Sequence, residues 1–192
     1  MSVSAIRGEL RTAAVAGWLS AAVILVNAAD HAGLLPSSAL TQLVAPLAQI
    51  FAIGLVLGLY AAARRDGGPL LLVGLIANLA ALAALSGVEI VTNLVFAYLD
   101  SAQIDELLAG PLNIALVSIS MLFIIATLVF AAALWRNAGA PRVPLVLYSV
   151  AVLPIDLRPF VPELALQLSL ALLATAVAWL AVALWKRAAE AA

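Results

Sequence analysis

The chain has 192 residues, of which 66% are hydrophobic and 10% are charged, and its formal net charge is −1. A soluble domain carries about 25% charged residues, so this composition excludes an ordinary soluble protein and predicts one embedded in a lipid bilayer. The absence of cysteine excludes disulfides, thiolate catalysis and cysteine-held zinc or iron–sulfur centres. The near-neutral charge gives no reason to expect a nucleic-acid partner.

Six apolar stretches, separated by Arg, Gly and Pro residues, have the character of membrane spans. A helix needs about 20 apolar residues to cross a hydrocarbon core roughly 30 Å thick, and backbone groups in lipid are satisfied only by helices or closed barrels. We therefore predict an all-α fold, a six-transmembrane-helix bundle that forms a single membrane domain over residues 1–192. The predicted spans are approximately 13–33, 40–63, 70–99, 112–135, 143–157 and 164–185.

The first stretch follows Arg7 and Arg11 and in this respect resembles a secretory signal. Its apolar run, from Thr12 to Ala29, is long for a signal core, so we interpret it as the first membrane helix. The second stretch contains a Gly-x-x-x-Gly pattern at Gly54 and Gly58. This pattern is typical of close helix contacts in membranes, and we expect it to lie within the bundle.

The third stretch would be roughly 45 Å long at 1.5 Å per residue, which exceeds the thickness of the hydrocarbon core. We expect it to tilt, to bend near Ser86-Gly87 or to project beyond the membrane. Ala80, Ala83, Ala84 and Gly87 form a stripe of small residues that predicts a packing seam. Asn78, near mid-depth, predicts a hydrogen bond to a neighbouring helix.

A short surface helix is predicted at 101–109, on the outer side, because Asp100 or Ser101 can cap it and Gly110-Pro111 ends it. It could lie along the membrane interface or cover a pocket. The fifth stretch is short, with Pro144 at its start and Pro154 near its end, where proline should kink or terminate a helix. We interpret it as a crossing.

The basic residues predict the orientation. With six crossings, eight of the nine Lys and Arg residues fall on one side, and Arg158 alone falls on the other. Basic loops are cytoplasmic in membrane proteins, so we place both termini in the cytoplasm. The excess of Arg over Lys and the abundant Ala indicate a GC-rich bacterial genome, and the predicted location is therefore the cytoplasmic (inner) membrane.

Glu89 is the strongest candidate for a functional residue, because it lies inside the third span between Val88 and Ile90. A carboxylate there must be paired, protonated or in contact with a water-filled cavity. Several further polar residues are expected at the same outer depth, and these are Asn93, Asn27, Asp30, His31, Asn113, Asp156 and Arg158. They predict an outer polar pocket with Arg158 as the counter-charge. Alternatively, they are the ordinary polar ends of spans, and Glu89 is merely paired with Arg158 or His31.

No catalytic, cofactor or metal signature accompanies these residues. The single His excludes bis-histidine haem within one protomer and zinc-protease motifs, and the only Lys, Lys186, lies at the cytoplasmic edge, where it cannot hold retinal. Glycine patterns for nucleotide binding and a G-x-S-x-G nucleophile are absent. We therefore assign no catalytic residue, no metal and no cofactor.

Three segments carry a resemblance to known proteins: Arg11 to Trp18, Leu59-Tyr60 before Arg64-Arg65, and Ala133 to Arg136. With its Ala/Leu-rich spans and short Arg/Gly/Pro turns, the chain resembles small multi-pass bacterial membrane proteins of uncharacterised function. The resemblance implies a polytopic membrane fold and transfers no activity or site residue.

Three functional hypotheses follow. The first is an accessory or interaction subunit of a membrane complex, with the lipid bilayer and other membrane subunits as its partners. The second is a binding protein or transporter for a lipid, quinone or other apolar small molecule, which would use the outer polar pocket. The third is an intramembrane enzyme with Glu89 or His31 as acid or base.

Overall fold

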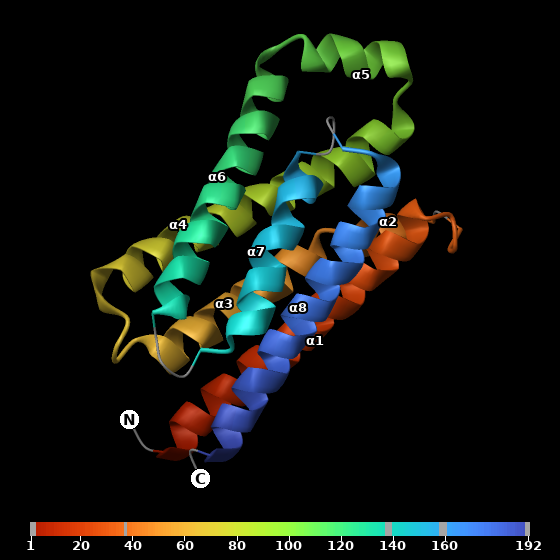
Figure 1. Ribbon diagram of the computed structural model, residues 1–192. Helices are drawn as coiled ribbons and strands as arrows, with labels where there is room; N and C mark the ends of the chain where they lie inside the picture. Colours follow the sequence, from red (N-terminus) through yellow and green to blue (C-terminus); the bar gives the residue numbers. More distant parts are fainter. Residues whose placement is uncertain (1–2, 37, 137–139, 158–160, 191–192) are drawn as a thin grey trace.

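The computed structural model describes residues 3–36, 38–136, 140–157 and 161–190, and all regular structure in these ranges is helical (Figure 1). The predicted all-α class is therefore confirmed. The helices are α1 (Val3–His31), α2 (Ala39–Val44), α3 (Leu47–Ala63), α4 (Gly68–Ile90), the π-helical turn η1 (Val91–Val95), the 3-10 turn η2 (Phe96–Tyr98), α5 (Ser101–Leu108), α6 (Pro111–Trp135), α7 (Arg142–Asp156) and α8 (Glu163–Glu190).

Five segments of the described chain are long and apolar enough to cross a membrane, and the prediction of six such helices is wrong at the fifth. The five segments are Ala5–His31, Ala39–Ala63, Gly68–Tyr98, Pro111–Trp135 and Glu163–Glu190. Helix α7 has 15 residues, about 22 Å at 1.5 Å per residue, which is less than the roughly 30 Å hydrocarbon core. Proline limits this helix, since Pro141 precedes its first residue and Pro154 lies in its last turn.

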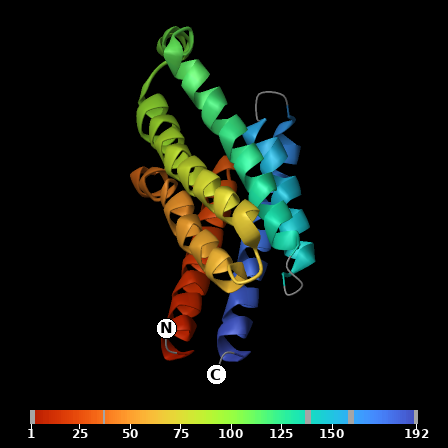
Figure 2. The same ribbon diagram turned by 90° about the vertical axis from the view of Figure 1, so that its left-hand side faces the viewer.

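The long helices form a closed ring in chain order. Helix α1 packs against α3, α3 against α4, α4 against α6, α6 against α7, α7 against α8, and α8 packs back against α1. Figures 1 and 2 show both termini at the same end of the molecule, which we call the terminal end, because successive helices run in opposite directions. The short α2 and α5 lie at the opposite end.

Helices α1, α3 and α8 approach closely through small residues. A Cβ atom built on Gly17 of α1 would lie 2.8 Å from the Cβ of Ala181 on α8, and one built on Gly54 would lie 2.8 Å from the Cβ of Ala16. A Cβ on Gly58 would overlap the Cβ of Ala13. Close backbone approach of this kind is how helices gain packing energy in lipid, where the hydrophobic effect contributes little between them.

The predicted seam on α4 faces outward. Ala80, Ala83 and Gly87 are exposed and Ala84 is half-buried, and a Cβ on Gly87 would meet no atom within 4 Å. The buried residues of α4 are instead Leu71, Gly74, Leu75, Asn78, Ala81 and Leu82. Gly74 marks the true contact, because a Cβ there would lie 2.9 Å from the Cα of Phe130 on α6.

The core is concentrated towards the terminal end. Residues 83–122, all of which the structure describes, include no buried side chain. They comprise the last turns of α4, then η1, η2, α5 and the first half of α6. Figures 1 and 2 show that α5 and the adjoining turns of α6 extend beyond the other helices. We call residues 83–122 the arm.

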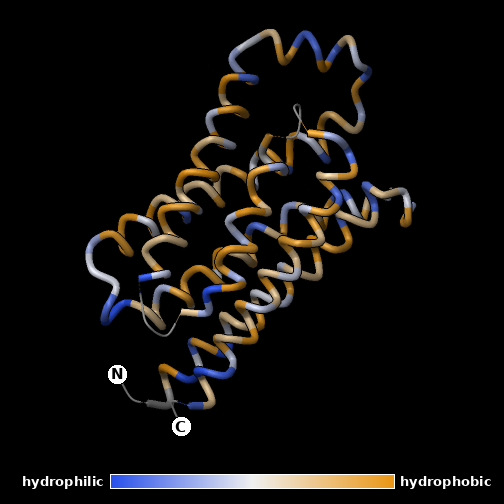
Figure 3. The backbone as a smooth tube through the Cα atoms, viewed as in Figure 1, coloured by the Kyte–Doolittle hydropathy of each residue, from blue (hydrophilic) through white to orange (hydrophobic). Residues whose placement is uncertain are grey.

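Charge is distributed along the same direction. All eight Lys and Arg residues in the described ranges lie in helix ends or turns at the terminal end, and Figure 3 shows hydrophilic segments at both ends of an otherwise apolar bundle. The basic residues are Arg7, Arg11, Arg64, Arg65, Arg136, Arg142, Lys186 and Arg187. Most acidic residues lie towards the opposite end, and these are Asp30, Glu89, Asp100, Asp105, Glu106, Asp156 and Glu163.

Candidate functional site

Glu89 lies on the inward face of α4, at the base of the arm. It follows Leu71, Asn78 and Leu82 at spacings of eighteen, eleven and seven residues, which return to the same side of an α-helix. Its side chain is half-buried. The helix therefore directs this carboxylate towards the bundle and not towards the surrounding lipid.

Two amide side chains hold the carboxylate. Asn93 Nδ2 donates to Glu89 Oε2 over 2.8 Å and to the Glu89 backbone carbonyl over 2.9 Å. Gln49 Nε2 on α3 donates to Glu89 Oε1 over a longer 3.5 Å. The Gln49 Oε1 atom is buried and has no hydrogen-bond partner in the described chain. The Glu89 side chain thus joins α4 to α3.

A change of helix type produces this geometry. The Phe96 amide donates to the Val91 carbonyl, five residues earlier, as a π-helix requires. Thr92 Oγ1 donates to the carbonyls of Val88, over 3.0 Å, and Glu89, over 3.3 Å. The Thr92 hydroxyl and the Asn93 amide therefore donate hydrogen bonds to backbone carbonyls at the point where α-helical hydrogen bonding gives way to the π-turn. Single π-turns are rare and occur frequently at functional sites.

Helix α2 closes one side of the site. The Tyr98 hydroxyl donates to Gln42 Oε1 over 3.1 Å, which ties η2 to α2. A capping box between Ser38 and Thr41 starts α2, since each side chain takes part in a hydrogen bond to the backbone amide of the other. Tyr98 is exposed and Gln42 is half-buried, so the link lies at the rim of the site.

The structure brings Asn93, one of the predicted partners, to Glu89. Asn27 and Asp30 are half-buried near the end of α1, where His31 is exposed. Helix α3 lies between α1 and α4 in the ring, and it is Gln49 of α3 that reaches the carboxylate. The sequence contained a signal for Gln49, because it is an uncharged polar residue within an apolar span.

The remaining predicted residues divide into two groups. Asn113 is exposed in the first turn of α6, beyond α5, at the end of the arm that Figure 1 shows furthest from α1. Arg158 lies outside the described residues, as does the side chain of Asp156.

Other polar groups inside the bundle serve helix packing. Ser20 Oγ on α1 donates to the Ala48 carbonyl at the start of α3 over 2.8 Å. Asn78 Nδ2 donates to Thr127 Oγ1 over 3.3 Å, the interhelical bond that the sequence predicted for Asn78. Both residues of that pair are fully buried, and Asn78 Oδ1 has no partner in the described chain.

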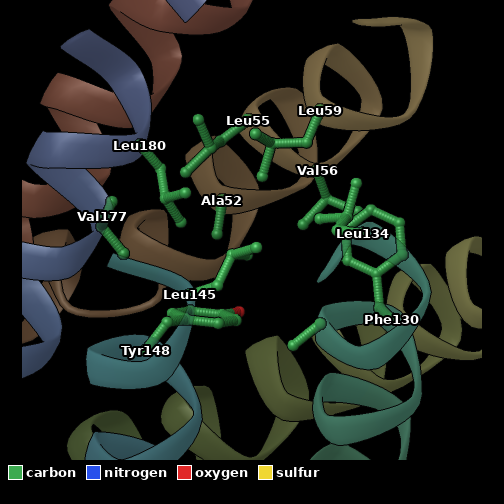
Figure 4. Close-up of a pocket in the computed structure, with 11 residues that line it drawn as sticks. Ala52, Leu55, Val56, Leu59, Phe130, Leu134, Leu145, Tyr148, Val177 and Leu180 are labelled. Carbon is green, nitrogen blue, oxygen red and sulfur yellow. The ribbon is translucent and has the colours of Figure 1, made fainter. Parts of the chain in front are cut away.

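An apolar cavity lies between α3, α6, α7 and α8, nearer the terminal end than Glu89 (Figure 4). Leu55, Phe130, Leu145 and Leu180 point into it, and the Tyr148 hydroxyl is the one side-chain oxygen among the lining residues. Its volume of about 20 Å³ accommodates about one water molecule. A quinone or an acyl chain would have to displace core side chains, so this cavity is not a ready site for such a ligand.

The described residues contain no group of three or more His, Asp or Glu side chains that could hold a metal ion. Comparisons with protein-family models, with curated proteins and with solved structures find no match to the chain. The site must therefore be interpreted from its own geometry.

Proposed function

We propose that this protein is an accessory subunit of the bacterial cytoplasmic membrane, which binds another membrane protein through its arm. The observation that carries the proposal is the absence of buried side chains over residues 83–122. The interior supports a surface role, since Ser20 and Asn78 form hydrogen bonds between helices and its described cavity holds about one water.

The proposed topology has six crossings with both termini in the cytoplasm. Termini at the same end require an even number of crossings. A helix as short as α7 can complete its crossing where the bilayer thins locally, at a modest cost in free energy. The concentration of basic residues at the terminal end supports a cytoplasmic location for that end.

The outward face of α4 supports a protein partner in preference to lipid alone. Ala80, Ala83 and Gly87 are exposed small residues, along which another helix could approach the backbone closely. Across the arm, Ile114 of α6 is 70% exposed. A partner helix that contacts both α4 and α6 would bury this surface and gain packing energy that disordered lipid tails do not provide.

Site-specific photo-crosslinking in native membranes tests the proposal. A benzoylphenylalanine in place of Ile114 should give one protein adduct of constant mass, and the same residue in place of Leu25 should not. Leu25 is a matched control because it is 52% exposed and apolar but lies on α1, outside the arm. The substitution Ala83→Leu, which adds bulk to this stripe of small residues, should abolish the adduct. Lipid adducts alone at both sites, or an adduct that survives Ala83→Leu, would refute a partner on the arm.

A second candidate function is supported by the Glu89 site. The π-turn and the unpartnered Gln49 Oε1 favour a bound amphiphile, such as a lipid or quinone, whose polar group would reach the site from the outer side. Native mass spectrometry on gently released protein tests this alternative. A retained small molecule that disappears in a folded Glu89→Gln variant would support it, and the same molecule retained by both proteins would exclude Glu89 as its ligand.

A further inference from the structure

At the terminal end, α1 and α8 share an edge that carries two arginines and two tryptophans. Arg7, Arg11 and Trp18 recur at spacings of four and seven residues, so they lie on one face of α1. Trp185 of α8 lies beside this face. Its indole ring is centred 5.3 Å from that of Trp18, and the two planes are inclined by 42°.

The aromatic and basic side chains contact one another. The Arg11 guanidinium carbon lies 5.0 Å from the centre of the Trp185 ring, within the range of a cation–π interaction. The rings of Trp18 and Trp185 are 36% and 37% exposed. They therefore present apolar surface outward, directly beside a positive charge that is held in place.

Arg7 adds a donor that the described residues leave unused. Its side chain is half-buried, and its Nε atom is buried with no hydrogen-bond acceptor in the described chain. No described carboxylate forms an ion pair with Arg7 or Arg11, and Glu9 lies on the opposite face of the helix, two residues from each. Two guanidinium groups one turn apart, with free donors, match the oxygens of a phosphate group.

The length of the helices places this edge at the membrane surface, given the orientation proposed above. Helices α1 and α8 have 29 and 28 residues, each about 42 Å long, which exceeds the roughly 30 Å hydrocarbon core. They remain packed towards their tips, since Leu10 and Ala188 are both buried. Tryptophan favours the level of the lipid headgroups, and Arg11 and Arg7 lie about two and three turns from Trp18 towards the aqueous end.

We propose that this edge binds the headgroup of an anionic phospholipid, with its phosphate between Arg7 and Arg11 and its glycerol and upper acyl region against Trp18 and Trp185. The tryptophans favour a lipid over free phosphate, because a free ion would make no use of the exposed rings. Basic surfaces between membrane helices on the cytoplasmic side are known to bind anionic headgroups. The site is at the opposite end from the arm, so it stands or falls independently of the partner proposed there.

Tryptophan quenching by brominated lipid in nanodiscs tests the site. In a Trp135→Phe/Trp179→Phe background, only Trp18 and Trp185 report. Brominated phosphatidylglycerol, as a minor component in phosphatidylcholine, should quench this protein more than brominated phosphatidylcholine does at the same fraction. Arg7→Gln/Arg11→Gln should weaken the apparent affinity for phosphatidylglycerol by at least about tenfold, since each basic side chain near the surface contributes on the order of 1 kcal/mol.

The matched control removes two positive charges from the same end but away from the edge. Arg65→Gln/Arg136→Gln should retain the preference for phosphatidylglycerol within a factor of about two or three, because both side chains are exposed in turns. Arg7→Lys/Arg11→Lys should fold and retain part of the preference. An equal loss in the control, an unchanged affinity in Arg7→Gln/Arg11→Gln, or displacement of the lipid by inorganic phosphate alone would overturn the proposal.

Discussion

Gly58 offers the sharpest test of how the bundle is held together. A Cβ at this position would overlap the Cβ of Ala13 on α1, and it would lie 3.0 Å from Cδ1 of Leu184 on α8. The leucine can move its side-chain end, but neither Cβ can rotate away from the other. Carbon atoms in contact prefer about 3.5–4.0 Å, so Gly58→Ala must separate α1 from α3 by about 1 Å and weaken dispersion along the seam.

The expected free energy follows from two opposing effects. Overpacking a well-packed contact costs about 1–3 kcal/mol, and replacing a helical glycine by alanine returns at most about 1 kcal/mol. We therefore expect Gly58→Ala to lower the free energy of unfolding by about 1–2 kcal/mol. Gly87→Ala is the matched control, because no atom lies within 4 Å of a Cβ at that position, and it should be neutral or stabilising by up to about 1 kcal/mol.

Unfolding in mixed micelles of increasing SDS content, followed by circular dichroism, measures both variants against the parent protein. If α1 and α3 are in close contact at Gly58, Gly58→Ala should unfold at a lower SDS content than the parent protein. Gly87→Ala should unfold at the same or a higher SDS content. If Gly58→Ala is as stable as the parent, or if Gly87→Ala is destabilised to the same extent, the argument from close packing at this seam is wrong.

Three further substitutions probe other features of the bundle. Thr127→Val should destabilise the fold by about 1–2 kcal/mol in the same assay, because it leaves the buried Asn78 amide without its acceptor, and adding Asn78→Leu should recover part of the loss. Tyr98→Phe should change stability by less than about 0.5 kcal/mol, since the hydrogen bond to Gln42 is exposed; a larger loss would show that α2 anchors the arm. Phe130→Ala should enlarge the cavity between α3, α6, α7 and α8 enough to admit xenon, detectable by ¹²⁹Xe NMR as a shift absent from the parent protein, and an unchanged xenon signal would indicate that the helices collapse into the space.

The open arm and the inward-facing Glu89 are parts of one arrangement. Buried side chains on α4 end at Leu82, nine residues before the π-turn begins at Val91. Glu89 therefore lies at the boundary between packed and unpacked chain, where its hydrogen bonds to Gln49 and Asn93 compensate for a carboxylate placed among apolar residues.

The sequence by itself determined the helical class and the division into elements. Long apolar runs interrupted by Arg, Gly and Pro define the helices, because an apolar chain can satisfy its backbone groups only internally. Local chemistry determined some ends: Asp100 forms a capping box with Gln103 at the start of α5, and Pro111 occupies the first turn of α6. The prolines at its two ends indicated that α7 is short. Its length decides whether the chain has five or six helices long enough to cross a membrane.

Only the tertiary structure decided which face of each helix is buried. In a soluble protein the polar face shows which side is exposed, but here lipid-facing and core-facing residues are equally apolar. The stripe at Ala80, Ala83 and Gly87 therefore looked like a seam, although Gly74 and Asn78 form the actual contact with α6. The pairing of Glu89 with Gln49, forty residues earlier, likewise depends on the order of α3 and α4 in the ring and on a π-turn that no local residue pattern announced.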